Sequence, residues 1–383
     1  MNGRRPWRAA LIGILVIGLF YYAYNALGIG STVHQLGRIY QVIHYLKTES
    51  LYPVDINALA EGAMQGMVKS MKDPYTVYLT PAEYGDLNTR ISGRFGGVGV
   101  VVGIREGNQL TIAAPPYTGT PAERAGLKQG DVIVVIDGRD ISGLDADSAV
   151  ALMRGEPGTK LVLGIRREGQ PELIEVPIVR DIINIPTVQG RVLSEDSRIG
   201  YIAISNFSQT TGADLRKELE KINYRGLKGL ILDLRNNPGG ELGAAVEVTG
   251  NFVPKGPVVR IVDRNGQEEV HSTDGKQTVH LPLVVLTNEM SASASEIVAG
   301  AIKDRKAGIL VGKTTYGKGV VQVVYPLTDG AGLKLTTSKY LTPDGNDIDK
   351  RGVVPDVTVE PPASGQEDTQ LAKAISVVQS QFK

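Results

Sequence analysis

The chain has 383 residues, which is enough for two or three domains. Its 41 basic and 41 acidic residues cancel, so no overall field attracts nucleic acid, and we predict no nucleic-acid partner. The sequence contains no cysteine, which excludes disulfide bonds and thiolate chemistry. This says little by itself about the cell compartment.

The first predicted element is an almost entirely apolar helix at Ala9–Leu27. At about 1.5 Å per residue, its length is close to the thickness of a bilayer core. Arg4, Arg5 and Arg8 precede it, which leaves the N-terminus in the cytoplasm and the rest of the chain outside. A cleaved signal peptide is the alternative, with Ala26–Gly28 as a weak cleavage site. We favour an uncleaved membrane anchor, and both interpretations place the later domains in the periplasm or at the cell exterior.

The next region, residues 31–91, is predicted to be helical. Apolar residues recur at helical spacing between Val33 and Leu46, and a second helix begins at Leu59. Pro74 and Pro81 interrupt the pattern. These residues predict a small helical packing domain without chemistry of its own.

A separate module follows at residues 92–180. A glycine-rich run at Phe95–Val100 opens a strand, and the motif PAERAGL at Pro121–Leu127 precedes GDVI at Gly130–Ile133. This arrangement resembles a PDZ domain, which binds an extended peptide by strand addition and holds its terminal carboxylate with loop N–H groups. The resemblance implies the following peptide-binding residues: Gly96, Gly97, Val98, Gly99, Val150 and Arg154.

Simpler interpretations of these residues remain open at this point. Glycines in such a run commonly serve only a tight turn. Arg154 ends the predicted helix Asp147–Arg154, which would flank the groove, and a solvated cation at a helix end is favourable without any further role.

After a linker near Asp181–Pro186, strands and helices alternate, which predicts an α/β core. The predicted strands are Gly200–Ile204, Gly229–Leu234, Leu281–Thr287 and Ile309–Gly312. The predicted helices are Gly212–Ile222, Glu241–Gly250 and Ser291–Asp304, with a last helix at Asp368–Phe382. More strands are expected between residues 325 and 360.

Two residues of this core suggest a reaction. A buried strand that leads into a helix with Ser293 at its start places a hydroxyl beside free helix N–H groups. Serine is a weak nucleophile unless a base takes its proton, and a neutral lysine can do so. Free lysine has a pKa of about 10.4, so apolar burial of Lys318 would have to lower it. None of the four histidines lies in a recognisable triad motif, so we favour the lysine as the base.

Taken alone, these two residues also have ordinary explanations. Ser293-Ala-Ser-Glu296 has the form of a capping box, in which the serine only caps the helix. Lys318 between two glycines fits an exposed loop lysine.

The pair SASASEI and YGKGVVQ resembles the carboxyl-terminal processing peptidases, a family of serine endopeptidases with a Ser-Lys dyad. The resemblance implies that Ser293 is the nucleophile, Lys318 the base and Gln322 the residue that orients the amine. The run DLRNNPGG at residues 233–240 also matches the family, in which Gly239 and Ala294 would supply the backbone oxyanion hole. Without the resemblance, this run would be interpreted as a plain strand-to-helix turn.

The resemblance predicts hydrolysis of protein or peptide substrates with accessible C-termini, without a metal or cofactor. It also implies that the region 31–91 supports a homo-oligomer. Lys313 departs from the family pattern, because many relatives have an acidic residue there. A non-catalytic PDZ scaffold is the alternative from another class, and an esterase or amidase acting on small molecules is a second one.

We therefore predict a multidomain protein of mixed α+β and α/β class. Its predicted parts are a membrane anchor or signal segment (residues 1–30), a helical region (31–91), an inserted PDZ domain (92–180), a serine protease core (181–360) and a C-terminal linker with a helix (361–383).

Overall fold

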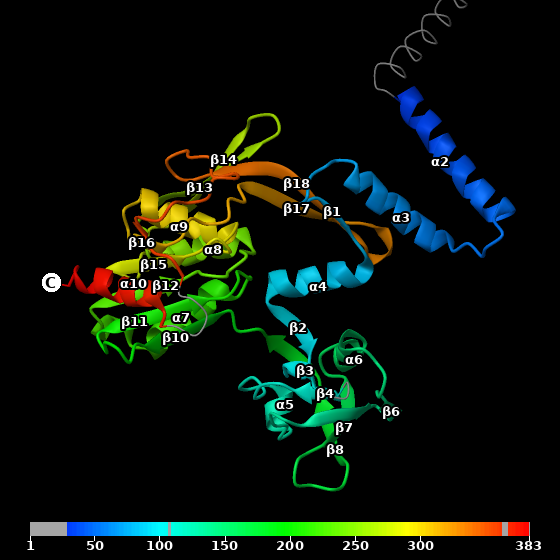
Figure 1. Cartoon of the computed structure of the whole chain (residues 1–383), viewed down its shortest axis with the longest axis horizontal. Helices are drawn as coiled ribbons and strands as arrows, with labels where there is room; N and C mark the ends of the chain where they lie inside the picture. Colours follow the sequence, from blue (N-terminus) through cyan, green and yellow to red (C-terminus); the bar gives the residue numbers. More distant parts are fainter. Residues whose placement is uncertain (1–28, 106–108, 362–366, 383) are drawn as a thin grey trace, which may run out of the picture. The chain divides into compact units, whose positions relative to one another are not determined.

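The computed structural model describes residues 29–105, 109–361 and 367–382. The chain forms two compact units, residues 1–78 and 79–383, and each is described by itself (Figure 1). The predicted membrane segment Ala9–Leu27 lies outside the described residues. Within the ranges that are described, no helix combines the length and apolar character needed to cross a membrane.

The first unit contains two helices, α2 (Ile29–Glu49) and α3 (Ile56–Lys69), as predicted for this region. Asp55 caps α3, because its carboxylate accepts the Asn57 N–H at 2.8 Å. α3 has no buried residue, so its apolar side chains remain accessible. The strand β1 (Val77–Leu79) lies at the boundary of the two units.

The second unit begins with α4 (Pro81–Ser92), which is closed at its start by a capping box between Thr80 and Glu83. A sheet of order β3-β4-β5-β7-β8 follows, with β6 paired to β5. Its strands are β3 (Val102–Arg105), β4 (Gln109–Ile112), β5 (Val132–Ile136), β6 (Arg139–Asp140), β7 (Lys160–Arg166) and β8 (Ile174–Val179). The helices α5 (Pro121–Arg124) and α6 (Ala146–Met153) complete this module.

The start and the end of this module lie side by side. β2 (Arg94–Gly97) pairs antiparallel with β9 (Asp181–Asn184), so the chain enters and leaves the module through one two-stranded ribbon. Its core is formed by alternate apolar residues such as Leu161, Leu163 and Ile165, which are fully buried. This arrangement agrees with an inserted domain.

The centre of the remaining chain is a sheet of order β10-β11-β12-β15-β16-β19. β10 is antiparallel to β11, and the other neighbours are parallel. The strands are β10 (Val188–Val192), β11 (Ile199–Ile204), β12 (Gly229–Asp233), β15 (Leu283–Thr287), β16 (Ile309–Gly312) and β19 (Val357–Thr358). The prediction of an α/β core is thus confirmed.

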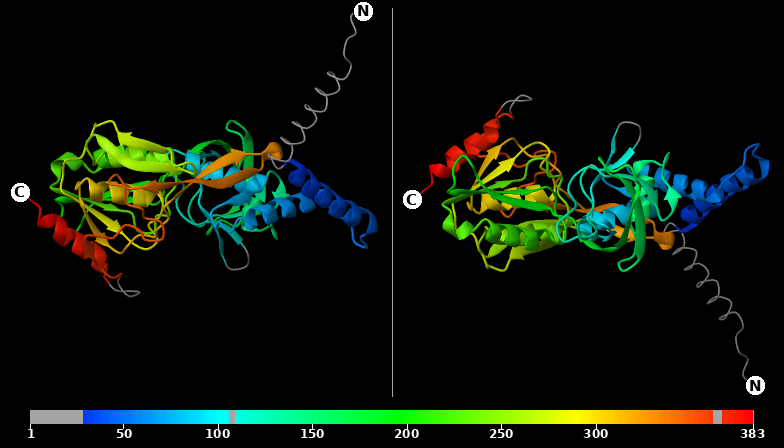
Figure 2. Two further views of the ribbon diagram at one scale, coloured as in Figure 1. Left: turned by 90° about the horizontal axis from the view of Figure 1, so that it is seen from above. Right: turned by 90° about the horizontal axis from the view of Figure 1, so that it is seen from below.

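Helices cover both faces of this sheet. α7 (Thr211–Lys221), α8 (Leu242–Gly250) and α9 (Ala294–Asp304) pack on one face, against residues such as Leu230 and Leu232. α10 (Thr369–Gln379) packs on the other face, against residues such as Ile231 and Val284. Figure 2 shows α10 on the side of the sheet away from α8 and α9. Alternate strand residues point to opposite faces, so both kinds of contact come from the same strands.

A second sheet was only partly predicted. In it β18 (Gly332–Leu341) lies between β13 (Gly256–Asp263) and β17 (Val320–Pro326), and β14 (Glu268–Thr273) pairs with β13. No prediction was made for residues 251–280, because β13 is mostly half-buried, β14 is mostly exposed, and both mix polar with apolar residues. Two short 3₁₀ turns, Tyr224–Gly226 and Thr328–Gly330, complete the fold.

Candidate active site

The turn between β15 and α9 has an unusual backbone conformation at Ser293. The helix α9 begins at Ala294, three residues later than predicted, so Ser293 occupies the N-cap position. Its φ of 54° and ψ of −113° lie outside the regions that side chains normally allow. Such strain costs about 1–3 kcal/mol and clusters at functional sites. A strained turn from a strand into a helix is also the arrangement that exposes nucleophiles in other hydrolases.

The three serines of the SASAS run have different surroundings. Ser291 and Ser295 are fully buried, and their hydroxyls donate to Leu234 O at 2.7 Å and to Asn237 O at 3.0 Å. Both hydroxyls therefore bind the turn that carries Ser293 to the loop after β12. Ser293 is only half-buried, which leaves it the accessible member of the three.

Glu296 connects the serine turn with the lysine loop. Its side chain has no exposed surface, and its Oε2 accepts the Ser293 N–H at 2.8 Å and the Lys318 N–H at 2.9 Å. Its Oε1 accepts the Thr315 hydroxyl at 2.6 Å and the Gly317 N–H at 2.7 Å. One carboxylate oxygen thus joins the backbones of Ser293 and Lys318, which are far apart in the sequence.

Lys318 lies half-buried in the loop between β16 and β17, beside Gly317 with a φ of 87°. Gln322 lies on β17, where a bulge interrupts the pairing with β18. Its amide nitrogen donates to Val320 O at 3.3 Å and to Thr336 Oγ1 at 3.4 Å. The predicted role of Gln322 toward the amine stays a prediction.

The predicted oxyanion donors differ in their hydrogen bonding. Within the described part of the chain, the Ala294 N–H has no acceptor, so this donor is available to bind an oxyanion. The Gly239 N–H instead donates to Asn237 Oδ1 at 2.9 Å, in the Asx turn that an Asn-Pro-Gly sequence favours. Gly239 can act as predicted only after this bond breaks. Among the described residues, the next N–H, that of Gly240, has no acceptor.

With this geometry described, comparisons with known proteins identify the family. The model of peptidase family S41 matches residues 198–359, the PDZ domain model matches 112–167, and the model of the activating protease CtpB N-terminal domain matches 25–82. The chain is 41% identical to the carboxyl-terminal-processing protease of Synechocystis sp., over 78% of this chain and 71% of that protein. The chain belongs to the carboxyl-terminal processing proteases.

A second curated relative belongs to the same family. The protease is 37% identical to the carboxy-terminal processing protease CtpA of Bacillus subtilis, over 87% of this chain and 70% of that protein. A solved structure of a photosystem II D1 C-terminal processing protease is 34% identical, with a TM-score of 0.49, over 83% of this chain and 85% of that one. The protein is therefore a serine endopeptidase with a PDZ domain, and the non-catalytic scaffold is not supported.

The PDZ module of the protease brings most of the predicted peptide-binding residues together. A cavity of about 130 Å³ is lined by Gly97, Val98, Gly99, Val150 and Arg154, with Phe95, Val100, Val102 and Met153. Gly96 does not line it, because its backbone meets that of Gly155, whose N–H donates to Gly96 O at 3.2 Å. Gly96 and Gly97 also belong to β2 and not to a free loop.

Arg154 has two partners in the second unit. Its guanidinium lies over the ring of Phe95, 5.6 Å from the ring centroid, and donates to Asp86 of α4 at 2.6 Å. It is therefore more than a solvated cation at the end of a helix. Sequence reasoning could not find Asp86, because the pattern of α4 gives it no distinguishing signal.

Within the described ranges, no group of three or more His, Asp or Glu side chains is arranged to hold a metal ion. A charged cluster at the end of β12 consists of Arg235 with Asp233 and Asp368. The sequence motif DLRNNPGG contains Asp233 and Arg235 but gives no sign that Arg235 pairs with Asp368.

A substitution of Gly239 tests the contact between the loop after β12 and the turn that carries Ser293. A methyl group at this position would lie 2.6 Å from Ala292 O, 2.8 Å from Ser293 Cβ and 2.9 Å from Ala294 N. We expect Gly239→Ala to reduce kcat on the order of 10²-fold, because it displaces the serine turn and crowds the Ala294 donor. Gly266→Ala is the matched control, with a φ of 79° and open space around the new methyl. Equal kcat values for the two variants would contradict the expected contact.

Proposed function

We propose that this protease hydrolyses protein substrates through an acyl-enzyme, with Ser293 as nucleophile and Lys318 as base. The observation that carries the proposal is the shared oxygen of Glu296, which accepts the N–H groups of both residues. The strained backbone of Ser293 supports the same assignment. So does the full burial of Ser291 and Ser295, which leaves neither hydroxyl accessible to a substrate.

In the proposed reaction, the neutral amine of Lys318 takes the proton of the Ser293 hydroxyl while Oγ attacks the scissile carbonyl carbon. The tetrahedral oxyanion is stabilised by the Ala294 N–H together with an N–H of the loop at residues 239–240. Collapse of this intermediate expels the amine, which receives the proton from Lys318. Water then attacks the ester and releases the acid and Ser293. The amide oxygen of Gln322 would accept a hydrogen bond from the lysine and orient it.

Labelling with a peptide phosphonate that reacts with activated serines tests this proposal. The full-length protein is treated with the probe, digested and mapped by mass spectrometry, and cleavage of an unfolded protein is followed in parallel. We expect the adduct on Ser293 and loss of cleavage as labelling proceeds. An adduct on Ser291 or Ser295, or cleavage that persists after complete labelling, would overturn the assignment.

We also propose that the PDZ module binds the C-terminal tails of substrates. The cavity beside Gly97, Gly99 and Val150 supports this, because it lies between a glycine-rich segment and α6. The test compares two peptides of the same sequence, one with a free terminal carboxylate and one with a terminal amide. A KM several-fold higher for the amide is expected, and equal KM values would remove carboxylate recognition.

The segment Ala9–Leu27 is proposed to anchor the protease in the membrane, with the catalytic domains in the periplasm or at the cell exterior. Its support is the apolar sequence and the preceding arginines. Extraction of cell membranes with alkaline carbonate tests the anchor, and protease treatment of cells with a permeabilised outer envelope and an intact cytoplasmic membrane tests the orientation. Release by carbonate would contradict the anchor, and full protection from externally added protease in permeabilised envelopes would contradict the orientation.

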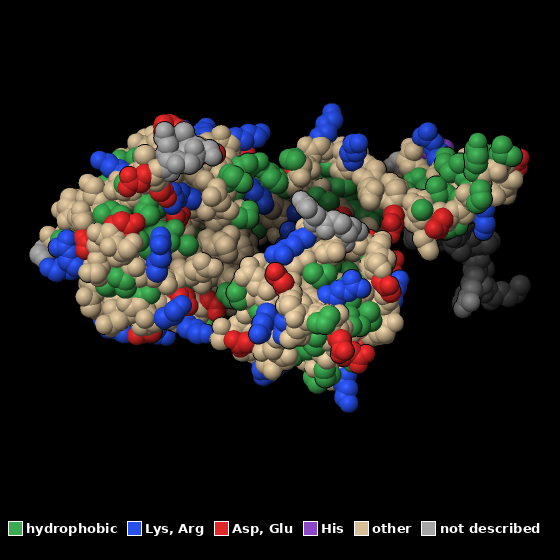
Figure 3. Space-filling view, turned by 60° about the horizontal axis from the view of Figure 1, so that its bottom comes forward, with side chains coloured by type: hydrophobic (Ala, Val, Ile, Leu, Met, Phe, Trp, Pro, Cys, Tyr) green, Lys and Arg blue, Asp and Glu red, His purple; other side chains and the backbone are tan. Residues whose placement is uncertain are grey.

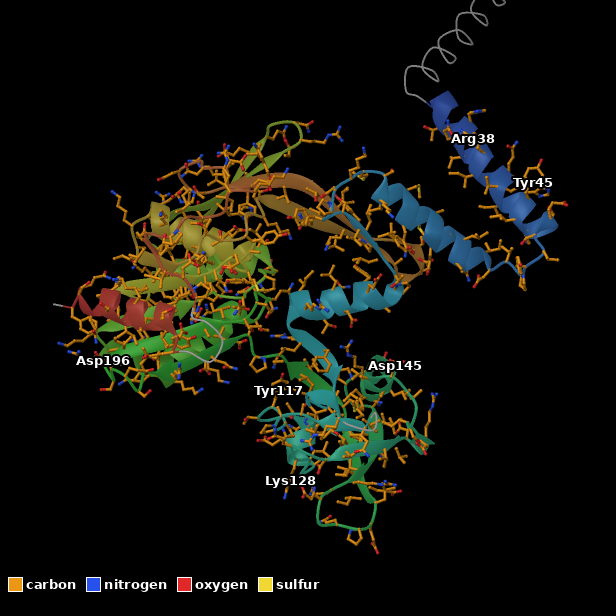
Figure 4. All side chains as sticks on the ribbon, viewed as in Figure 1. Arg38, Tyr45, Tyr117, Lys128, Asp145 and Asp196 are labelled. Atoms are coloured by element: carbon orange, nitrogen blue, oxygen red, sulfur yellow. The ribbon has the colours of Figure 1, made fainter. Side chains whose placement is uncertain are left out.

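A homo-oligomer formed through the first unit is the last part of the proposal. α2 and α3 expose many apolar side chains (Figure 3). A groove of about 440 Å³ runs between the two helices. The groove is lined by Gln35, Arg38, Ile39, Val42, Ile43, Leu46, Leu59 and Ala63. Arg38 and Tyr45 mark two positions along α2 in Figure 4. So much exposed apolar surface on one helical pair is typical of a protein interface.

The oligomer is tested by sedimentation of the detergent-solubilised protein. We expect Val42→Glu to shift the protein toward the monomer, because it places a charge in the groove. Thr48→Glu on the same helix adds the same charge outside the groove and should leave the mass unchanged. A wild type that sediments as a monomer at all concentrations would remove this part of the proposal.

A further inference from the structure

The side chain of Arg235 lies between two carboxylates at the start of the loop that carries Gly239 and Gly240. Its Nε donates to Asp233 Oδ1 at 3.0 Å and its Nη2 to Asp233 Oδ2 at 2.6 Å. Its Nη1 and Nη2 donate to Asp368 Oδ1 and Oδ2, both at 2.9 Å. The guanidinium therefore makes a two-point contact with each acid, the geometry that best fixes an arginine.

Asp368 is itself held by a rigid element. It is the N-cap of α10 and accepts the Leu371 N–H at 3.0 Å. α10 is anchored on the central sheet by buried apolar residues, among them Ala374 and Val378. The position of the Asp368 carboxylate is thus set by the packing of the C-terminal helix.

The loop that begins with Arg235 is joined directly to the serine turn. Asn236 and Asn288 exchange two hydrogen bonds, of 2.9 and 2.8 Å. One residue further, Asn237 O accepts the Ala292 N–H at 3.0 Å. A shift of Arg235 would therefore displace the backbone on both sides of the proposed oxyanion hole.

The charges of this cluster depend on one another. The side chain of Arg235 is 15% exposed and that of Asp233 is 8% exposed. Burial alone would lower the pKa of Arg235, but its bonds to the two acids raise it overall. Burial acts to raise the pKa of Asp368, and the bond from Arg235 outweighs it and lowers that pKa. The side chain of Asp368 is 38% exposed, so it forms the solvent side of the cluster, and loss of its charge would weaken its two bonds to the Arg235 guanidinium.

A cavity of about 660 Å³ leaves Arg235 room to move if it is released. It is lined by Asp233, Arg235, Asn236, Asn288 and Asp368, among others. Loss of the Asp368 charge would leave the guanidinium with Asp233 and with Gln370 Oε1, which accepts from Nη1 at 3.2 Å. The guanidinium could then turn toward water in this cavity, which would loosen the start of the loop.

We propose that Asp368 is a positioning residue of the protease, through which the C-terminal helix holds the oxyanion loop in its productive conformation. This inference rests on the proposed function of Ser293 and the loop at residues 235–240. It predicts that α10 contributes to kcat as well as to stability.

The experiment compares Asp368→Asn with Asp196→Asn in the full-length protein. Asp196 is the matched control, because it pairs with Arg198 at 2.7 Å and accepts from Gln379 at the other end of α10 at 2.8 Å. Figure 4 labels Asp196. For Asp368→Asn we expect kcat to fall about tenfold with KM unchanged, since only the alignment of the loop is lost. For Asp196→Asn we expect both constants to stay at the wild-type values.

Thermal unfolding and phosphonate labelling of Ser293 accompany the kinetics. An unchanged kcat in Asp368→Asn would overturn the inference. So would an equal loss of kcat in Asp368→Asn and Asp196→Asn that is accompanied by an equal drop in unfolding temperature. Absence of the Ser293 adduct in the wild type would instead show that the proposed function has failed. Restoration of kcat in Asp368→Glu, which keeps the charge, would support the positioning role.

Discussion

Replacing Lys318 by alanine is expected to reduce kcat/KM on the order of 10³-fold or more, with little change in stability. The reason is that the Ser293 hydroxyl then lacks the base that accepts its proton. The backbone of residue 318 keeps its bond to Glu296 in this variant, so the serine turn should remain in place. Cleavage of a peptide substrate under single-turnover conditions measures the acylation step directly.

Lys318→Arg separates the role of a base from that of a positive charge. Arginine cannot be deprotonated in a protein, so it keeps the charge but cannot take the serine proton. We expect this variant to be as inactive as Lys318→Ala. Substantial activity in Lys318→Arg would show that the side chain contributes charge alone, and the dyad would have to be abandoned.

Lys313→Ala is the matched control from the same loop. The departure of Lys313 from the family pattern raised the question of an uncompensated charge near the turn. The structure answers it, because Lys313 Nζ donates to both carboxylate oxygens of Glu360 at 2.7 Å. This bond to Glu360 is the largest cause of the raised pKa of Lys313, and the negative charges of Glu360 and Glu289 add to it. The ion pair is partly exposed and contributes little, so Lys313→Ala should retain nearly full activity.

The sequence permitted two interpretations of Ser293-Ala-Ser-Glu296, and the structure shows that they do not exclude each other. A capping box is present at the start of α9, as the pattern S-x-x-E predicts. The same Glu296 reaches across to the loop of Lys318, which the pattern could not show. Local spacing predicts local hydrogen bonds, whereas the contact with Lys318 depends on the parallel pairing of β15 with β16.

Other features could not be predicted for the same reason. The pairing of Arg235 with Asp368 joins residues that are 133 positions apart in the sequence, and no local pattern connects them. The hydrogen bond from the Gly239 N–H to Asn237 Oδ1 could have been predicted from the sequence, since Asn-Pro-Gly favours an Asx turn. The alternation of strands and helices was predicted correctly, because buried parallel strands read as continuous apolar runs. The half-buried strand β13 and the mostly exposed strand β14 mix polar with apolar residues instead.

The variant Glu296→Gln is expected to lose kcat on the order of 10²-fold and about 2–5 kcal/mol of unfolding free energy. The carboxylate accepts on both oxygens, and an amide can accept on only one. If the amide nitrogen takes the place of Oε2, it faces the N–H groups of Ser293 and Lys318. If it takes the place of Oε1, it faces the Gly317 N–H. In either orientation a buried donor loses its partner, and the two loops separate.

Glu83→Gln supplies the control for the capping contribution of Glu296. Glu83 forms the same capping box in α4, where its Oε2 accepts the Thr80 N–H at 2.9 Å. Loss of this capping hydrogen bond in Glu83→Gln should lower the free energy of unfolding by about 1 kcal/mol and leave kcat unchanged. If both variants lost the same stability and neither lost activity, Glu296 would be a helix cap alone. If instead Glu296→Gln alone loses kcat, with KM retained, the carboxylate sets the distance between the nucleophile and its base. The catalytic pair would then be assembled by a third side chain that touches neither the proton nor the substrate.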